Sequence, residues 1–152
     1  THEEEDEILG RHREGSPLDR VEPIASMAEL TAAVALARRI YAAPDLVHYV
    51  TSLVRATRTH DAVELGASPR ASLALLHAAQ ARAAMQGRSY VSPDDVKALV
   101  SPVLGHRIIL SPEARLRGRN LEAVLDEVCS SVPVPVEGRI GLPPDLPAPN
   151  GQ

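Results

Sequence analysis

The sequence predicts an all-α protein, a small helical bundle followed by a Pro-rich irregular C-terminal tail. Hydrophobic residues make up 44 % of the 152 residues but aromatic residues only 2 %, so the core must consist of Ala, Leu, Val and Ile. Such cores are typical of closely packed helices, and apolar residues do recur here at helical spacing. Because a chain of this length supports one core of ordinary size, we assign residues 1–132 to one helical domain and 133–152 to the tail.

Two helices are expected in the N-terminal part. The stretch 3–12 carries acidic residues first and then Ile8 and Leu9, a charge order that suits the dipole of a helix. From Ser26 the sequence Ser-Met-Ala-Glu forms a capping box. One face of the following segment is apolar, at Leu30, Val34, Ala37 and Tyr41. We expect this second helix to end near Tyr41.

The third helix should begin at Pro44, a residue that suits the first turn of a helix. Its apolar stripe consists of Leu46, Val50, Leu53 and Val54. Arg55 and Arg58 lie in the last turn, where cations favour the helix dipole. We expect the helix to end around His60.

A fourth helix is the most clearly marked in the sequence. Gly66 permits a turn, Ser68 is a good N-cap residue and Pro69 suits the first helical position. Residues 71–86 are strong helix formers up to Gly87, which is typical of a helix end. Small Ala side chains lie on nearly every side of this segment, so we expect it to be the central helix of the bundle.

Two further helices are expected before the tail. The second Ser-Pro pair, Ser92-Pro93, begins one whose apolar residues Val96, Leu99 and Val100 face inward until Pro102 breaks it. A last amphipathic helix follows the N-cap residue Asn120, with apolar residues at Leu121, Val124, Leu125 and Val128.

Two segments lack a clear helical pattern. The β-branched stretch 107–110 could be an extended strand or an apolar plug against the bundle, and periodicity does not choose between them. Beyond Val132 the chain is rich in Pro and Gly, which predicts an extended or disordered tail.

Composition excludes several classes of function. The net charge is −4 and Lys97 is the only lysine, so a nucleic-acid-binding surface is not expected. Cys129 is the only cysteine, which rules out an internal disulfide and indicates a reducing cytoplasm. We find no signal peptide and no membrane span, and therefore expect a soluble, unanchored protein. The chain has no initiating Met and opens like the middle of a helix, so we expect a piece of a larger protein.

The sequence also argues against catalysis by this chain alone. A phosphate-binding loop ends in Gly-Lys-Ser/Thr, but Lys97 follows Val96 on a helix. The six His residues stand singly, so a zinc site is not expected. Asp94 and Asp95 could form an acid/base pair, but their place in a first turn favours helix capping. Cys129 lies at the end of an apolar stripe without a cationic neighbour, which indicates an inert thiol.

Arg70 is the candidate for a functional role. It is the second residue of the central helix, where a cation opposes the helix dipole at a cost of about 0.3–1 kcal/mol. A phosphate at this position would be attracted by both the free backbone amides and the guanidinium. The alternative is an exposed arginine screened by solvent or paired with Glu64. The residues alone leave both interpretations open.

The stretch 64–76, Glu-Leu-Gly-Ala-Ser-Pro-Arg-Ala-Ser-Leu-Ala-Leu-Leu, resembles the signature of the lid domain of MoxR-type AAA+ ATPases. The resemblance continues upstream over residues 45–58 and downstream over 87–96 and His106-Arg107. The acidic opening is also similar to the helix where the core of that family passes into the lid. Roughly residues 3–133 are covered.

The resemblance implies that Arg70 is the sensor-2 arginine, with Ser68 and Pro69 beside it at the nucleotide. This arginine reaches the γ-phosphate of ATP bound on the preceding α/β core of the same subunit. The full-length protein would then use ATP and Mg²⁺, and the lid alone would bind neither tightly. The phosphate loop, the Mg²⁺-binding acidic strand, the first sensor and the arginine finger of the family have no counterpart in this sequence.

The resemblance also implies partners: the AAA+ core of the same chain, neighbouring subunits of a hexameric ring, and client proteins with von Willebrand A domains that the ring matures as a chaperone. No nucleic acid and no membrane are expected. A competing interpretation is a stand-alone helical module that binds another protein and handles no nucleotide. A helix-turn-helix after Ser68 is a third interpretation, and the acidic balance of the chain opposes it.

Overall fold

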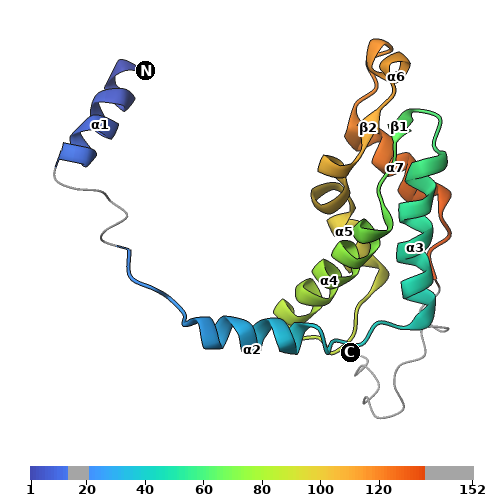
Figure 1. Cartoon of the computed structure of the whole chain (residues 1–152), viewed down its shortest axis with the longest axis horizontal. Helices are drawn as coiled ribbons and strands as arrows, with labels where there is room; N and C mark the ends of the chain where they lie inside the picture. Colours follow the sequence, from blue (N-terminus) through green and yellow to red (C-terminus); the bar gives the residue numbers. More distant parts are fainter. Residues whose placement is uncertain (14–20, 136–152) are drawn as a thin grey trace, which may run out of the picture. The chain divides into compact units, whose positions relative to one another are not determined.

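The computed structural model describes residues 1–13 and 21–135, with side chains described for 1–10 and 21–135 (Figure 1). Apart from its first three residues, the predicted tail 133–152 lies outside the described residues, so the boundary at 132/133 stays a prediction. The chain divides into two compact units, Thr1–Ala33 and Val34–Gln152. Most described residues are helical, and the two strands found among them are short, which confirms the all-α prediction.

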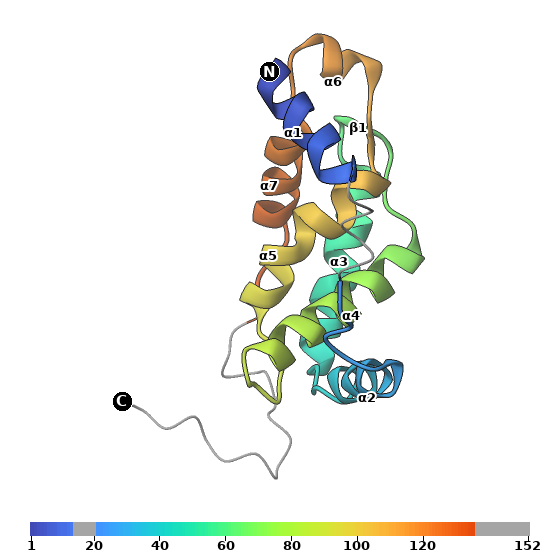
Figure 2. The same cartoon turned by 90° about the vertical axis from the view of Figure 1, so that its left-hand side faces the viewer.

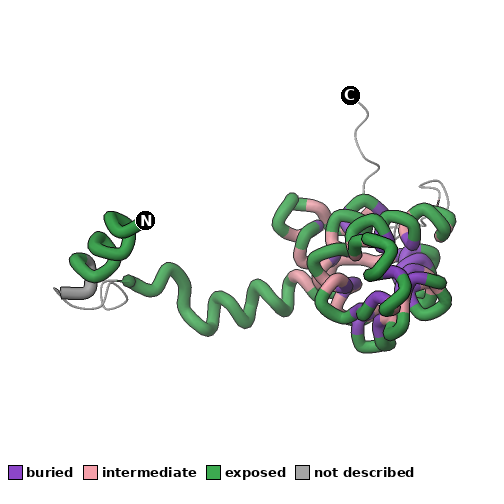
Figure 3. Tube along the Cα trace, turned by 90° about the horizontal axis from the view of Figure 1, so that it is seen from above, coloured by how far each residue is buried: buried purple, intermediate pink, exposed green. Residues whose placement is uncertain are grey.

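The first unit contains α1 (His2–Arg13), where a helix was expected, and most of α2 (Met27–Ala37). The capping box of α2 is present: Glu29 N donates to Ser26 Oγ over 3.2 Å, and Ser26 N donates to Glu29 Oε2 over 2.7 Å. None of the residues of α2 is buried (Figure 3), and Leu30 and Val34 of its predicted apolar face are exposed.

The prediction that α2 ends near Tyr41 is wrong, because the helix ends at Ala37. Tyr41 pairs instead with the segment around Tyr90: its amide donates to Ser89 O and its carbonyl accepts from Val91 N, each over 2.9 Å. The Gln80 side chain also donates to Ile40 O over 2.8 Å. These tertiary bonds occupy the backbone groups that another helical turn would need.

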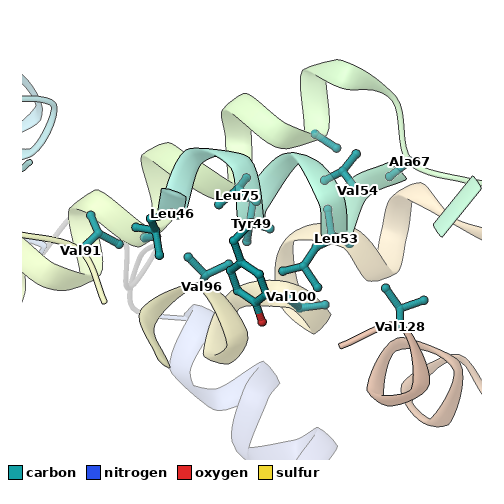
Figure 4. Close-up of a cluster of buried hydrophobic side chains, with 14 of the residues drawn as sticks. Leu46, Tyr49, Leu53, Val54, Ala67, Leu75, Val91, Val96, Val100 and Val128 are labelled. Carbon is teal, nitrogen blue, oxygen red and sulfur yellow. The ribbon is translucent and has the colours of Figure 1, made fainter. Parts of the chain in front are cut away.

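The second unit is a bundle of α3 (Pro44–Thr59), α4 (Pro69–Met85), α5 (Pro93–Leu104) and α7 (Leu121–Ser131) (Figure 2). The starts and ends of α3 and α4 agree with the predictions to within about one residue, and α7 begins directly after Asn120, as predicted. Its core consists of aliphatic side chains and one tyrosine (Figure 4). The buried face of α4 carries Ala71, Leu75, Ala79 and Ala83, so α3 and α5 can pack closely against it.

The end of α5 and the segment after it differ from the predictions. Pro102 lies inside α5 and does not end it, because Val100 and Leu104 bury their side chains on the same face and stabilise another turn. After a 3₁₀ turn at Gly105–Arg107, Ile108 packs into the main core, and β2 (Ile109–Leu110) pairs antiparallel with β1 (Val63–Leu65). The segment 107–110 is thus extended at Ile109–Leu110, and its Ile108 side chain fills the core as the alternative prediction described. A short helix that the pattern did not predict, α6 (Pro112–Leu116), follows.

Among the described residues, no helix is both long enough and apolar enough to span a lipid bilayer.

Candidate nucleotide-sensing site

The start of α4 is held close to α3 by the loop that follows β1. A Cβ atom at Gly66 would lie 2.6 Å from Arg58 Cγ and 2.7 Å from Arg58 Cα, which is closer than van der Waals contact. Only glycine therefore allows the loop backbone to approach α3 this closely. The sequence predicted Gly66 as a turn residue, and the structure shows that it is also required for the close packing of the loop against α3.

The next residue of the loop is bonded to the interior of α3. Ala67 is fully buried, and its amide donates to the hydroxyl oxygen of Thr57 over 3.0 Å. The same hydroxyl donates to Val54 O over 2.7 Å, and Thr57 is itself fully buried. Figure 4 shows Ala67 near Val54 at one end of the core. The loop is thus fastened to the helix just before α4 begins.

Arg70 lies three residues after Ala67, in the first turn of α4, and its side chain is exposed. The Arg70 guanidinium forms no hydrogen bond or ion pair with any residue that the structure describes, so the alternative pairing with Glu64 is not present. Ser68 occupies the N-cap position and Pro69 the first helical position, as predicted, and both are exposed. The Ser68 side chain makes no capping bond, which leaves the Arg70 amide available together with its guanidinium.

This arrangement suits a phosphate group chemically. A helix N-terminus attracts anions, and a guanidinium can donate two parallel hydrogen bonds to phosphate oxygens. Arg55 and Arg58, on the exposed face of α3, line a shallow hollow of about 490 Å³ and form no ion pair with the described residues. The sequence had indicated these two arginines only as cations of a helix end.

A partly buried ion pair that was not predicted joins the turn after α4 to the start of α5. Arg88 donates to Asp95 Oδ2 over 2.7 Å and to Asp95 Oδ1 over 2.6 Å, and Asp95 is only 2 % exposed. Asp95 also accepts from Ser92 N over 2.9 Å and completes a capping box. Burial raises the pKa of Asp95, but the hydrogen bonds from Arg88 and Ser92 outweigh it and hold that pKa below its ordinary value.

The ion pair with Arg88 and the capping box support a capping role for Asp95 over an acid/base role. Asp94, the other member of the possible acid/base pair, is exposed. Cys129 is half-buried, and burial raises the pKa of its thiol, as expected for an inert cysteine. The described residues contain no group of three His, Cys, Asp or Glu side chains that could hold a metal ion. Arg70 therefore remains the candidate functional residue.

The chain is similar to several known proteins. Residues 55–128 match the family model described as "AAA lid domain". The chain is 37 % identical over 134 residues to Uncharacterized protein YeaC of Bacillus subtilis (strain 168). This match covers 88 % of this chain and 42 % of that protein. The chain is 34 % identical over 142 residues to Chaperone MoxR1 of Mycobacterium tuberculosis, covering 88 % of this chain and 37 % of that one. The chain thus spans about two fifths of the length of these curated relatives.

The crystal structure of an ATPase candidate from Cytophaga hutchinsonii has a similar fold. The TM-score is 0.63 at 28 % sequence identity, and the match covers 67 % of this chain and 34 % of that one.

Proposed function

The chain belongs to the AAA lid domain family and is related to the MoxR-type AAA+ ATPases, and from this premise we propose that it senses nucleotide through Arg70. In this proposal Arg70 is the sensor-2 arginine and donates to the γ-phosphate of ATP bound on the AAA+ core of the same protein. The observation that carries the proposal is an exposed guanidinium without a partner among the described residues, on a helix start that is fastened to the bundle.

The lid would act through a difference in contacts between nucleotide states. With ATP on the core, the Arg70 guanidinium would hold the lid closed, and loss of the γ-phosphate would release it. A hydrogen bond between charged groups contributes about 1.5–3 kcal/mol, and a difference of this size shifts a two-state equilibrium by about tenfold or more. Because the Ser68 side chain makes no capping bond, the Arg70 amide would be open to the same phosphate.

The proposal extends to the whole protein. It would bind ATP with Mg²⁺, assemble into a ring through contacts between neighbouring subunits, and act as a chaperone, the role named for the mycobacterial relative MoxR1. Client proteins with von Willebrand A domains are proposed from the family resemblance alone. We place the protein in the cytoplasm, where the single Cys129 would remain a free thiol.

The test is the ATP turnover of the full-length protein with Arg70→Ala. We expect kcat to fall about tenfold or more while the far-UV circular dichroism of the protein stays unchanged. Arg70→Lys, which keeps the charge but loses the paired donors, should recover only part of the activity. The matched control is Arg115→Ala, since Arg115 is also exposed and forms no ion pair with the described residues. Equal turnover in Arg70→Ala and wild type would overturn the assignment.

A second test concerns the protein to which the lid belongs. We expect the coding DNA upstream of Thr1 to encode a phosphate loop and an AAA+ core. A start codon there without such a core would support the competing interpretation, a stand-alone helical interaction module, and would make Arg70 an ordinary surface residue.

A further inference from the structure

The link between α3 and the start of α4 depends on one buried hydroxyl group. Thr57 uses its hydroxyl hydrogen for Val54 O, 2.7 Å away in the same helix. This bond directs the remaining lone pairs of the oxygen away from Val54, and one of them accepts the Ala67 amide over 3.0 Å. Bonding of a threonine to its own helix is common, but the bond to Ala67 joins residues ten positions apart.

The two ends of this bond are shielded from water, since Thr57 and Ala67 are both fully buried. A hydrogen bond in such surroundings is not readily replaced by one to solvent. The neighbouring Gly66 is in backbone contact with α3 at Arg58. Two consecutive loop residues are therefore held against α3, one by packing and one by a hydrogen bond.

The chain between this attachment and Arg70 is short and stiff. Only Ser68 and Pro69 intervene, and the ring of Pro69 restricts its own backbone φ angle. The Ala71 amide donates to Ser68 O over 2.8 Å and closes the first turn. A shift of Ala67 would therefore pass directly to the backbone of Arg70.

We propose that Thr57 is a positioning residue for Arg70: its hydroxyl sets the place from which the guanidinium reaches the phosphate. This inference rests on the proposed function of Arg70. Misplacement of a group by about 1 Å can cost on the order of a hundredfold in rate. If the hydrogen bond from Ala67 is lost, the packing of Gly66 against α3 remains, so the loop should move by less than about 1 Å. We therefore expect about a tenfold loss of turnover.

The experiment compares Thr57→Val with Thr57→Ser in the full-length protein. Valine has nearly the shape of threonine but has no hydroxyl, so the Ala67 amide loses its acceptor. Serine keeps the hydroxyl and should restore most of the turnover. All assays are run well below the melting temperature of each variant, so that the fraction of unfolded protein does not affect the rate.

The Arg70→Ala background separates positioning from a general effect on stability. If Thr57 acts through Arg70, Thr57→Val lowers kcat about tenfold in the wild type but less than twofold when Arg70 is already alanine. If the turnover of Arg70→Ala is too low to measure, the same cycle is determined from the rise in melting temperature on adding a non-hydrolysable ATP analogue.

Four results would contradict the argument, three of them at the role of Thr57 and one at the role of Arg70. Unchanged turnover in Thr57→Val, or the same loss in both backgrounds, would overturn the positioning role. A serine variant as impaired as the valine variant would also contradict it, because the hydroxyl is then not the group that matters. Unchanged turnover in Arg70→Ala would instead overturn the proposed function itself, whatever Thr57→Val does.

Discussion

Replacing Arg88 by methionine should lower the free energy of unfolding of the chain by about 3 kcal/mol. The Arg88 guanidinium donates to both carboxylate oxygens of Asp95, over 2.7 and 2.6 Å, and so joins the turn after α4 to the first turn of α5. Methionine keeps an unbranched side chain of similar length but leaves a buried carboxylate without its main partner.

The magnitude follows from burial and from the partners that remain. Removing one member of a buried ion pair typically costs about 3–5 kcal/mol. We take the lower end because the Arg88 side chain is 26 % exposed and the Arg82 Nε atom already lies 3.4 Å from Asp95 Oδ1. The amide and hydroxyl of Ser92 would also continue to donate to Asp95, each over 2.9 Å.

The assay is urea unfolding of the chain followed by far-UV circular dichroism at neutral pH. The control is Arg115→Met, which removes an exposed arginine without an ion pair to the described residues and should change stability by less than about 0.5 kcal/mol. If Arg88→Met destabilised the chain no more than this control does, the buried pair would not stabilise the fold.

The destabilisation should also depend on pH. The pKa of Asp95 is lower in the folded protein than in the unfolded chain, so its ion pair stabilises the fold fully above the unfolded value of about 3.9. This contribution is lost as the pH falls through the folded pKa and Asp95 takes up a proton. The difference between wild type and Arg88→Met should therefore shrink below about pH 4. A difference that stays constant down to pH 2 would refute the assignment to Asp95.

Three further predictions concern the packing and capping of the bundle, and each is measured by urea unfolding. Gly66→Ala should destabilise the chain by about 1–3 kcal/mol, because the added methyl group meets the backbone of Arg58; an unchanged midpoint would show that the loop can move away from α3. Tyr49→Phe should stabilise it by about 1 kcal/mol, because the buried hydroxyl has no hydrogen-bond partner among the described residues; a loss of stability would reveal a bonded water. Asn120→Ala should cost about 1 kcal/mol by removing the 2.7 Å bond from Ala123 N, whereas Asn120→Gly should cost only a few tenths, and equal costs would contradict the capping role.

The sequence alone was sufficient wherever the deciding interaction spans only a few residues. The capping box of Ser26 and Glu29 and the N-cap of Asn120 were predicted from spacing and are present. The buried stripe of α3 followed from helical periodicity in the same way. These features need no knowledge of the rest of the chain, because a helix brings residues three and four apart onto one face wherever it forms.

The position of Arg70 within a helix could likewise be predicted, since Ser68 and Pro69 mark the start of α4. That its guanidinium forms no ion pair with the described residues could not be predicted, because a possible partner such as Glu64 lies outside the helix. The sequence alone could not decide whether Arg70 is screened by solvent or paired with Glu64, because this depends on the geometry of the loop before α4.

Only the tertiary structure decided the features that join distant segments. The sequence contains no local signal that Tyr41 pairs with the segment at Tyr90, that β1 pairs with β2, or that Arg88 binds the capping residue Asp95. The same holds for Thr57, whose hydroxyl reads as an ordinary polar group until Ala67 is brought against it. The physical reason is that such bonds depend on how the chain reverses direction between helices. Helical periodicity shows which face of each helix is buried, but it carries no information about which other segment covers that face.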